Sequence, residues 1–111
     1  MSIEVTLRHM GSMENVQAYA RDCAQKLMDA FNRIEHVHVV LDHEKHLYKA
    51  EVVLHAGHHV RIEAFDELDN MRAAIDSAFE KVERQYRRVQ DKVHDHHPAR
   101  KEAEVRVERG E

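Results

Sequence analysis

Residues 36–65, HVHVVLDHEKHLYKAEVVLHAGHHVRIEAF, decide the fold, because apolar and polar side chains alternate along most of this stretch. Such alternation is typical of a β-strand with one buried face. The pattern occurs three times, with the apolar sets Val37, Val39 and Leu41, then Ala50, Val52 and Leu54, then Val60, Ile62 and Ala64. The polar segment 42–47 and the pair at 57–58 divide the strands by short connections, and the last strand should cover 59–65. The stretch therefore predicts an antiparallel meander.

Two helices and one more strand are expected around this meander. Alternation at 3–7 predicts a first strand with one buried face. Apolar residues recur at spacings of three and four over 13–32, which predicts an amphipathic helix. A second helix should open at 66–69, where three acids suit the positive end of a helix dipole, and continue to Val93.

The expected element order is therefore β-α-β-β-β-α. This order predicts an α+β domain in two layers, with a four-stranded sheet and two helices packed on one face. A chain of 111 residues fits one such domain, which we expect to cover 1–94. The segment 95–111 mixes charges, contains Pro98 and has no sustained periodicity, so a flexible C-terminal tail is expected there.

Composition restricts the cellular setting and the class of partner. The chain has one cysteine, Cys23, so an intrachain disulfide is excluded, and this suits a reducing cytosol. Neither a signal peptide nor an apolar run of membrane-spanning length is visible, which predicts a cytoplasmic protein without a membrane partner. The net charge of -4 argues against indiscriminate binding of nucleic acid but leaves room for a local basic surface.

Such a basic surface is expected on the second helix. Lys81, Arg84, Arg88 and Lys92 follow one another at spacings of three and four, so they share one helix face, and Arg87 lies on its flank. At 1.5 Å per residue the row is roughly 16 Å long, which could meet several phosphates of a nucleic-acid strand. Cations are also common on solvated helix faces and near the C-terminal end of a helix dipole. The row alone therefore does not decide between a nucleic-acid-binding surface and ordinary surface charge.

The run 69–93, DNMRAAIDSAFEKVERQYRRVQDKV, resembles the second helix of the ribosome hibernation promoting factors, also called the sigma-54 modulation protein family. This family includes ribosome-associated inhibitor A. The matching residues are Met71, Ala74, Ile75, Asp76, Lys81, Val82, Glu83, Arg84, Gln85 and Tyr86. The paired-strand block at 36–56 and an opening strand that ends in Arg8, His9 and Met10 match as well. The resemblance covers about residues 2–94.

The resemblance implies the same fold and a translation inhibitor without enzymatic activity. Family members bind the small ribosomal subunit in the channel of mRNA and tRNA, through contacts to rRNA phosphates, in stress or stationary phase. By position, it implies rRNA-binding roles for Arg8, Lys26, Lys81, Arg84, Arg88 and Lys92, with Arg87 beside them. Cofactors and small-molecule substrates are not implied, and we expect a monomer when the protein is free. Whether the protein promotes or opposes ribosome dimers stays open, as does the role of the tail.

Two alternatives to ribosome binding have little support in the sequence. An enzyme would need a catalytic constellation, whereas Cys23 falls on the apolar side of a helix, where a buried structural thiol is expected. A protein-interaction module could use the near-heptad apolar spacing of the last helix. Burial of this apolar row against the chain's own sheet explains the spacing more simply.

A histidine-rich metal-binding module is the third alternative. Neutral imidazole is a good ligand for zinc or nickel. The histidines gather in three places, namely His36 and His38, then His55, His58 and His59, then His94, His96 and His97. None of these sets has the spacing of a known zinc motif, so adventitious binding is expected and no metal site is assigned.

Overall fold

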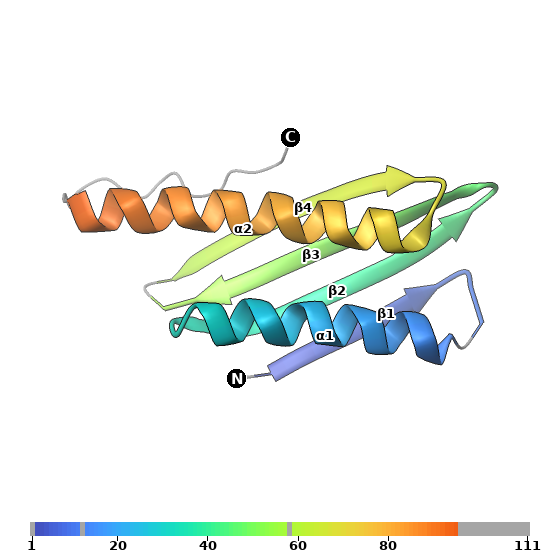
Figure 1. Ribbon diagram of the computed structural model, residues 1–111, viewed down its shortest axis with the longest axis horizontal. Helices are drawn as coiled ribbons and strands as arrows, with labels where there is room; N and C mark the ends of the chain where they lie inside the picture. Colours follow the sequence, from blue (N-terminus) through green and yellow to red (C-terminus); the bar gives the residue numbers. More distant parts are fainter. Residues whose placement is uncertain (1, 12, 58, 96–111) are drawn as a thin grey trace.

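The computed structural model describes residues 2–11, 13–57 and 59–95, and the side chains in these ranges as far as residue 91. Its elements are β1 (Ser2–Arg8), α1 (Glu14–Ala30), β2 (Ile34–Glu44), β3 (Leu47–Ala56), β4 (Val60–Leu68) and α2 (Met71–Asp95), as Figure 1 shows. The predicted element order and the α+β class are confirmed. The tail predicted at 95–111 lies, apart from its first residue, outside the described residues.

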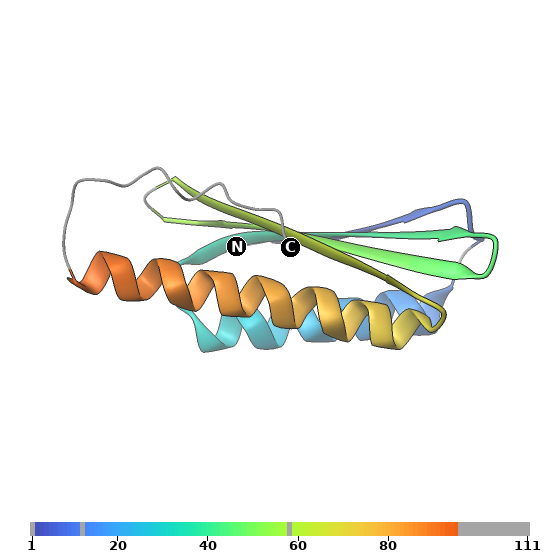
Figure 2. The same cartoon turned by 90° about the horizontal axis from the view of Figure 1, so that it is seen from above.

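The four strands form one mixed sheet in the order β1-β2-β3-β4. β1 runs parallel to β2, because α1 carries the chain back to the end of the sheet where β1 began. The pairs β2–β3 and β3–β4 are antiparallel, which confirms the predicted meander. Figure 2 shows that both helices cover the same face of the sheet. We call the opposite face the open face, and among the described residues no helix covers it.

The core lies between the sheet and the two helices, and the alternating apolar residues supply its sheet side. The fully buried residues of this side are Ile34, Val37, Val39, Leu41, Ala50, Val52, Leu54 and Ala64, and Ile62 is 2% exposed. The helices add Ala20, Ala24, Leu27, Met71, Ala74, Ile75, Ala78, Phe79, Val82 and Tyr86. Phe31, just after α1, meets Tyr86 of α2 edge to face, with ring centroids 5.2 Å apart. Burial of this apolar area is the main term that stabilises the fold.

The hairpin between β2 and β3 is longer than the sequence predicted. Residues 42–47 were expected to form a polar connection, but β2 continues to Glu44 and β3 begins at Leu47. Only Lys45 and His46 form the turn, and Lys45 has a φ of 59°. The strands persist because ladder hydrogen bonds need no apolar side chain, and because His43 stacks on Tyr48 with centroids 4.2 Å apart.

The start of the last helix was also predicted wrongly. β4 extends to Leu68 and α2 begins at Met71, so the acids at 66–69 belong to the strand and the turn. Asp66 and Leu68 continue the series of even-numbered residues that face the helices. The helix is capped by Asn70 instead, whose Oδ1 accepts a hydrogen bond from the Ala73 amide at 3.0 Å.

Neither α1 nor α2, as far as the structure describes them, is long and apolar enough to cross a membrane. Charged side chains interrupt α2 throughout its length.

Replacement of Ile75 by alanine should lower the free energy of unfolding by about 2–5 kcal/mol, because it leaves a cavity beneath α2. The Ile75 side chain is fully buried against the sheet. Urea unfolding followed by circular dichroism measures this change. Leu47→Ala is the matched control, since Leu47 is 36% exposed at the hairpin and should cost much less. Equal losses in the two variants would contradict the assigned core.

Candidate nucleic-acid interface

The two helices run side by side in the same direction, and this places their C-terminal ends at the same end of the molecule (Figure 1). Near the N-terminal ends, the Tyr19 hydroxyl donates a hydrogen bond to Asp76 at 2.5 Å, which raises the pKa of Tyr19 to about 12. The Arg72 guanidinium lies 4.4 Å from the centre of the Tyr19 ring. Near the C-terminal ends, Phe31 contacts Tyr86. Two aromatic contacts thus hold the helices together at both ends.

Lys81 is not a free member of the predicted cation row. Its Nζ lies 3.6 Å from Oδ2 of Asp66 and donates a hydrogen bond to the Phe65 carbonyl at 3.3 Å. Only 33% of the Lys81 side chain is exposed. Lys81 therefore joins α2 to β4, and this structural role limits its availability to a partner.

Asp66 is the centre of this junction. The Ser77 hydroxyl of α2 donates a hydrogen bond to its carboxylate, and the Glu67 amide donates another at 2.8 Å. These hydrogen bonds, with Ser77 the larger contributor, and the charge of Lys81 hold the pKa of Asp66 below its ordinary value, although partial burial opposes the shift. The charged carboxylate therefore helps to fix α2 on the sheet.

Arg84 and Arg88 match the predicted row more closely. Both side chains are exposed, and neither has a hydrogen bond or ion pair within the described part of the chain. Arg87 is also exposed, but it donates to Oε2 of Glu83 at 2.8 and 3.2 Å and lies 5.1 Å from the centre of the Phe31 ring. The side chain of Lys92, the last member of the row, lies outside the described residues.

Arg33 is a further exposed arginine that was not predicted as a site residue. It is exposed in the connection between α1 and β2 and has no ion pair among the described residues. Burial raises the pKa of Tyr86, and the charge of Arg33 opposes this shift, so the Arg33 guanidinium acts electrostatically on Tyr86 of α2. Only the parallel arrangement of the helices brings residue 33 to this place, and no local sequence signal marks it. We call Arg33, Arg84, Arg87 and Arg88 the arginine surface.

The other two predicted cations lie elsewhere. Arg8 ends β1 on the open face and pairs in register with Asp42, eight residues along β2 from Ile34. At about 3.3 Å per residue, that is roughly 26 Å from the end of the sheet next to Arg33. Lys26 lies on α1, and its Nζ is 3.6 Å from Oδ2 of Asp22. The structure therefore does not gather Arg8 and Lys26 with the arginine surface.

Among the described residues, Cys23, His36 and His38 have structural surroundings that need no catalytic or metal-binding role. Cys23 is half-buried rather than fully buried, and burial raises the pKa of its thiol. His36 and His38 form hydrogen bonds with Ser2 and Thr6 across the β1–β2 pair. In the described ranges no three His, Cys, Asp or Glu side chains are arranged to hold a metal ion. His58, His96 and His97, and the side chain of His94, lie outside those ranges.

The fold and the site define a small two-layer α+β domain whose second helix carries arginines towards its C-terminal end. A family model described as sigma 54 modulation protein / S30EA ribosomal protein matches residues 3–94. The chain belongs to this family, which confirms the resemblance found in the sequence.

Two curated relatives have a similar length. The ribosome hibernation promoting factor of Salmonella typhimurium (strain LT2) is 32% identical over 96 residues, which cover 86% of this chain and 100% of the relative. The protein of the same name from Escherichia coli (strain K12) is 31% identical with the same coverage.

Solved structures support the fold. A ribosomal subunit interface protein from Coxiella burnetii matches with a TM-score of 0.75 at 17% identity, over 83% of this chain and 100% of that one. The N-terminal domain of Thermus thermophilus Protein Y matches with a TM-score of 0.71 at 22% identity, over 80% and 99% of the two chains.

Replacement of Asp66 by asparagine should lower the free energy of unfolding by about 1 kcal/mol at pH 7, because the charged carboxylate binds Ser77 and Lys81. Because the pKa of Asp66 is lower in the folded state, its charged carboxylate stabilises that state at pH values above the ordinary aspartate pKa of about 3.9. This contribution is lost as the pH falls through the pKa of the folded state. The difference between wild type and variant should therefore shrink between pH 5 and pH 3.

Urea unfolding of both proteins across this pH range measures the effect. Glu80→Gln is the control, since Glu80 is exposed on α2 and has no partner among the described residues. A constant difference between wild type and Asp66→Asn down to pH 3 would contradict the role of the charged carboxylate.

Proposed function

We propose that this protein is a ribosome hibernation factor of the cytoplasm, which binds the small ribosomal subunit in the mRNA and tRNA channel and blocks translation in stress or stationary phase. The observation that carries the proposal is the exposed, unpaired state of Arg84 and Arg88 in the described structure. The names of the two bacterial relatives support the same role. Binding would be non-enzymatic and would require only that the domain occupy space needed by mRNA and tRNA.

The arginines suit rRNA phosphates in chemistry and in spacing. A guanidinium group can donate two hydrogen bonds to one phosphate, and it stays charged at every physiological pH. Arg84 and Arg88 are one helical turn apart, about 6 Å along the axis. Because neither is held by an acid among the described residues, binding need not break an ion pair of this part of the chain.

The distribution of charge along α2 would orient the protein on RNA. The described C-terminal part carries Lys81, Arg84, Arg87 and Arg88 against Glu83 and Asp91, whereas the first ten residues carry Arg72 against Asp76 and Glu80. A local positive potential next to a negative one steers one end of a molecule towards a polyanion. The overall charge of -4 is therefore compatible with RNA binding by this end alone.

In this proposal the predicted rRNA-binding residues differ in their roles. Arg84, Arg87 and Arg88, with Arg33, make the main phosphate contacts. Lys81 contributes mostly by holding α2 on the sheet, and Arg8 and Lys26 would reach RNA only if it extends beyond the arginine surface. Lys92 remains a predicted contact, since its place on α2 continues the row.

Replacement of both Arg84 and Arg88 by glutamate should abolish cosedimentation with purified small subunits at near-physiological salt. Each lost phosphate contact should reduce the slope of log K against log salt by about 0.9, so milder replacement of both by glutamine should reduce it by about two. Sedimentation binding assays over a range of salt concentrations measure both effects.

The matched control is the double variant Lys45→Glu and Lys49→Glu. It makes the same change in net charge at the β2–β3 hairpin, at the opposite end of the sheet. This control should bind almost as well as wild type, and circular dichroism should show that both variants are folded. Equal weakening of the two would indicate a net-charge effect and sink the assignment to the arginine surface.

A further inference from the structure

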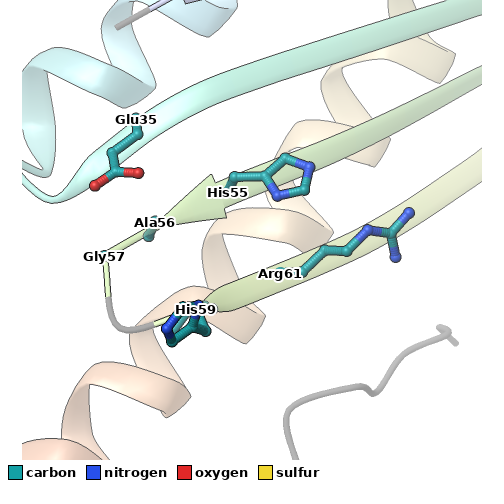
Figure 3. Close-up of a pocket in the computed structure, with 7 residues that line it drawn as sticks. Glu35, His55, Ala56, Gly57, His59 and Arg61 are labelled. Atoms are coloured by element: carbon teal, nitrogen blue, oxygen red, sulfur yellow. The ribbon is translucent and has the colours of Figure 1, made fainter.

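A hollow lies where β2 begins, β3 ends and β4 begins, and four polar side chains are among the residues that line it. It has a volume of about 480 Å³, and its polar side chains are Glu35, His55, His59 and Arg61. Figure 3 shows these side chains around the turn that joins β3 to β4. The hollow is not part of the predicted cation row, and the proposed function does not yet use it.

Cationic or titratable groups surround this hollow on three sides. His55 of β3 pairs in register with Arg61 of β4 and with His36 of β2, whose ring centroid is 5.8 Å away. His59 belongs to the turn. The one acid that lines the hollow is Glu35 of β2. Arg61 also donates to Oε1 of Glu63 at 3.1 Å, so part of its charge is already compensated.

The hollow adjoins the backbone of Arg33, one member of the arginine surface. The Gly57 amide, which lines the hollow, donates a hydrogen bond to the carbonyl of Arg33 at 3.0 Å. Figure 1 shows the β3–β4 turn at the same end of the molecule as the C-terminal half of α2. An RNA strand held by Arg33 and the helix arginines would therefore pass close to the hollow.

We propose that this hollow is a second phosphate-binding site for the RNA backbone, and that protonation of His55 strengthens it as the pH falls. The inference rests on the proposed function, which it extends from one helix to the adjoining hairpin. The ligand class is a phosphodiester of RNA, bound by the protonated His55 ring, the His59 side chain and the Arg61 guanidinium.

The direction of the pH effect follows from the surroundings of His55. Burial lowers the pKa of this imidazole, the charges of Arg61 and His36 lower it further, and Glu35 opposes the shift. His55 is therefore mostly neutral at pH 7 and gains its proton in more acid solution. A bound phosphate favours the protonated form, so binding takes up protons, and affinity rises as pH falls. Each proton taken up can change the affinity by at most about tenfold per pH unit.

The test compares binding to purified small subunits at pH 7.5 and pH 6.0 at constant salt. Wild type should bind more tightly at pH 6.0. The variant His55→Gln with His59→Asn should bind nearly as well as wild type at pH 7.5 and lose most of the gain at pH 6.0. Asparagine is chosen at position 59 because His59 has a φ of 62°, which asparagine tolerates.

The matched control is His46→Gln with His9→Asn. His9 has a φ of 58°, and both histidines are exposed at the far end of the sheet, at the end of β1 and in the β2–β3 turn. The control should keep the full pH response of wild type. A wild-type affinity that is unchanged between the two pH values, or a response that survives in the His55 and His59 variant, would overturn the inference.

A second measurement separates this inference from the proposed function. The full chain is titrated with a short uridine oligonucleotide at pH 6.0, and the backbone amides are followed by NMR. The Gly57 and Arg61 signals should shift in wild type and much less in the His55 and His59 variant. If small subunits fail to bind while these shifts appear, only the proposed function fails; if subunits bind and the shifts are absent, only the hollow is rejected.

Discussion

The structure depends on the packing of the inner face of α2 against β3 and β4. Ile75 and Val82 are fully buried there, and Tyr86 is almost fully buried beside Phe31. Once these side chains face the sheet, helical geometry sends Arg84 and Arg88 to solvent, because they lie two residues away from the buried positions 82 and 86. The exposed cations are therefore a consequence of core packing, and no separate device is needed to present them. The same packing buries the near-heptad row of apolar side chains. Little of this apolar surface is therefore left for a coiled-coil partner.

The Asp66 junction shows why the charge of a helix cannot be assigned from its own sequence. Helical spacing places Lys81 in the same row as Arg84 and Arg88, and the three residues do lie on one helix. Whether a cation in the row is free depends on the element beneath it, and here β4 brings Asp66 and the Phe65 carbonyl within reach of Lys81. The acids at 66–69 suit a helix N-terminus by composition, but the ladder with β3 continues through them to Leu68. A tertiary contact thus decided both the boundary of α2 and the state of one of its cations.

Elements with strong hydrophobic periodicity could be predicted correctly from the sequence. The alternating residues of β1 to β4 and the apolar rows of both helices predicted the class, the order of elements and nearly all of the core. The polar ends of the strands were harder to predict, because Asp42 and Glu44 extend β2 without an apolar residue that would indicate a buried face. Within the arginine surface, Arg84, Arg87 and Arg88 follow from helix periodicity, whereas Arg33 reaches this end of the molecule only because the two helices run parallel. Arg8 and Lys26 came from the family resemblance, and the structure places them away from the arginine surface.

The two ends of the open face differ in a way that supports one oriented mode of RNA binding. At the far end Arg8, Asp42, Lys49 and Glu67 pair in register across all four strands, so positive and negative charges alternate and compensate one another. At the near end the corresponding row is Ser2, His36, His55 and Arg61, which contains no acid. In this second row the pKa of His55 is lowered, so His55 gains its proton only in acid solution. The near end also carries the arginine surface, so both layers of the domain present cations at this end, alongside the acids Glu4 and Glu35.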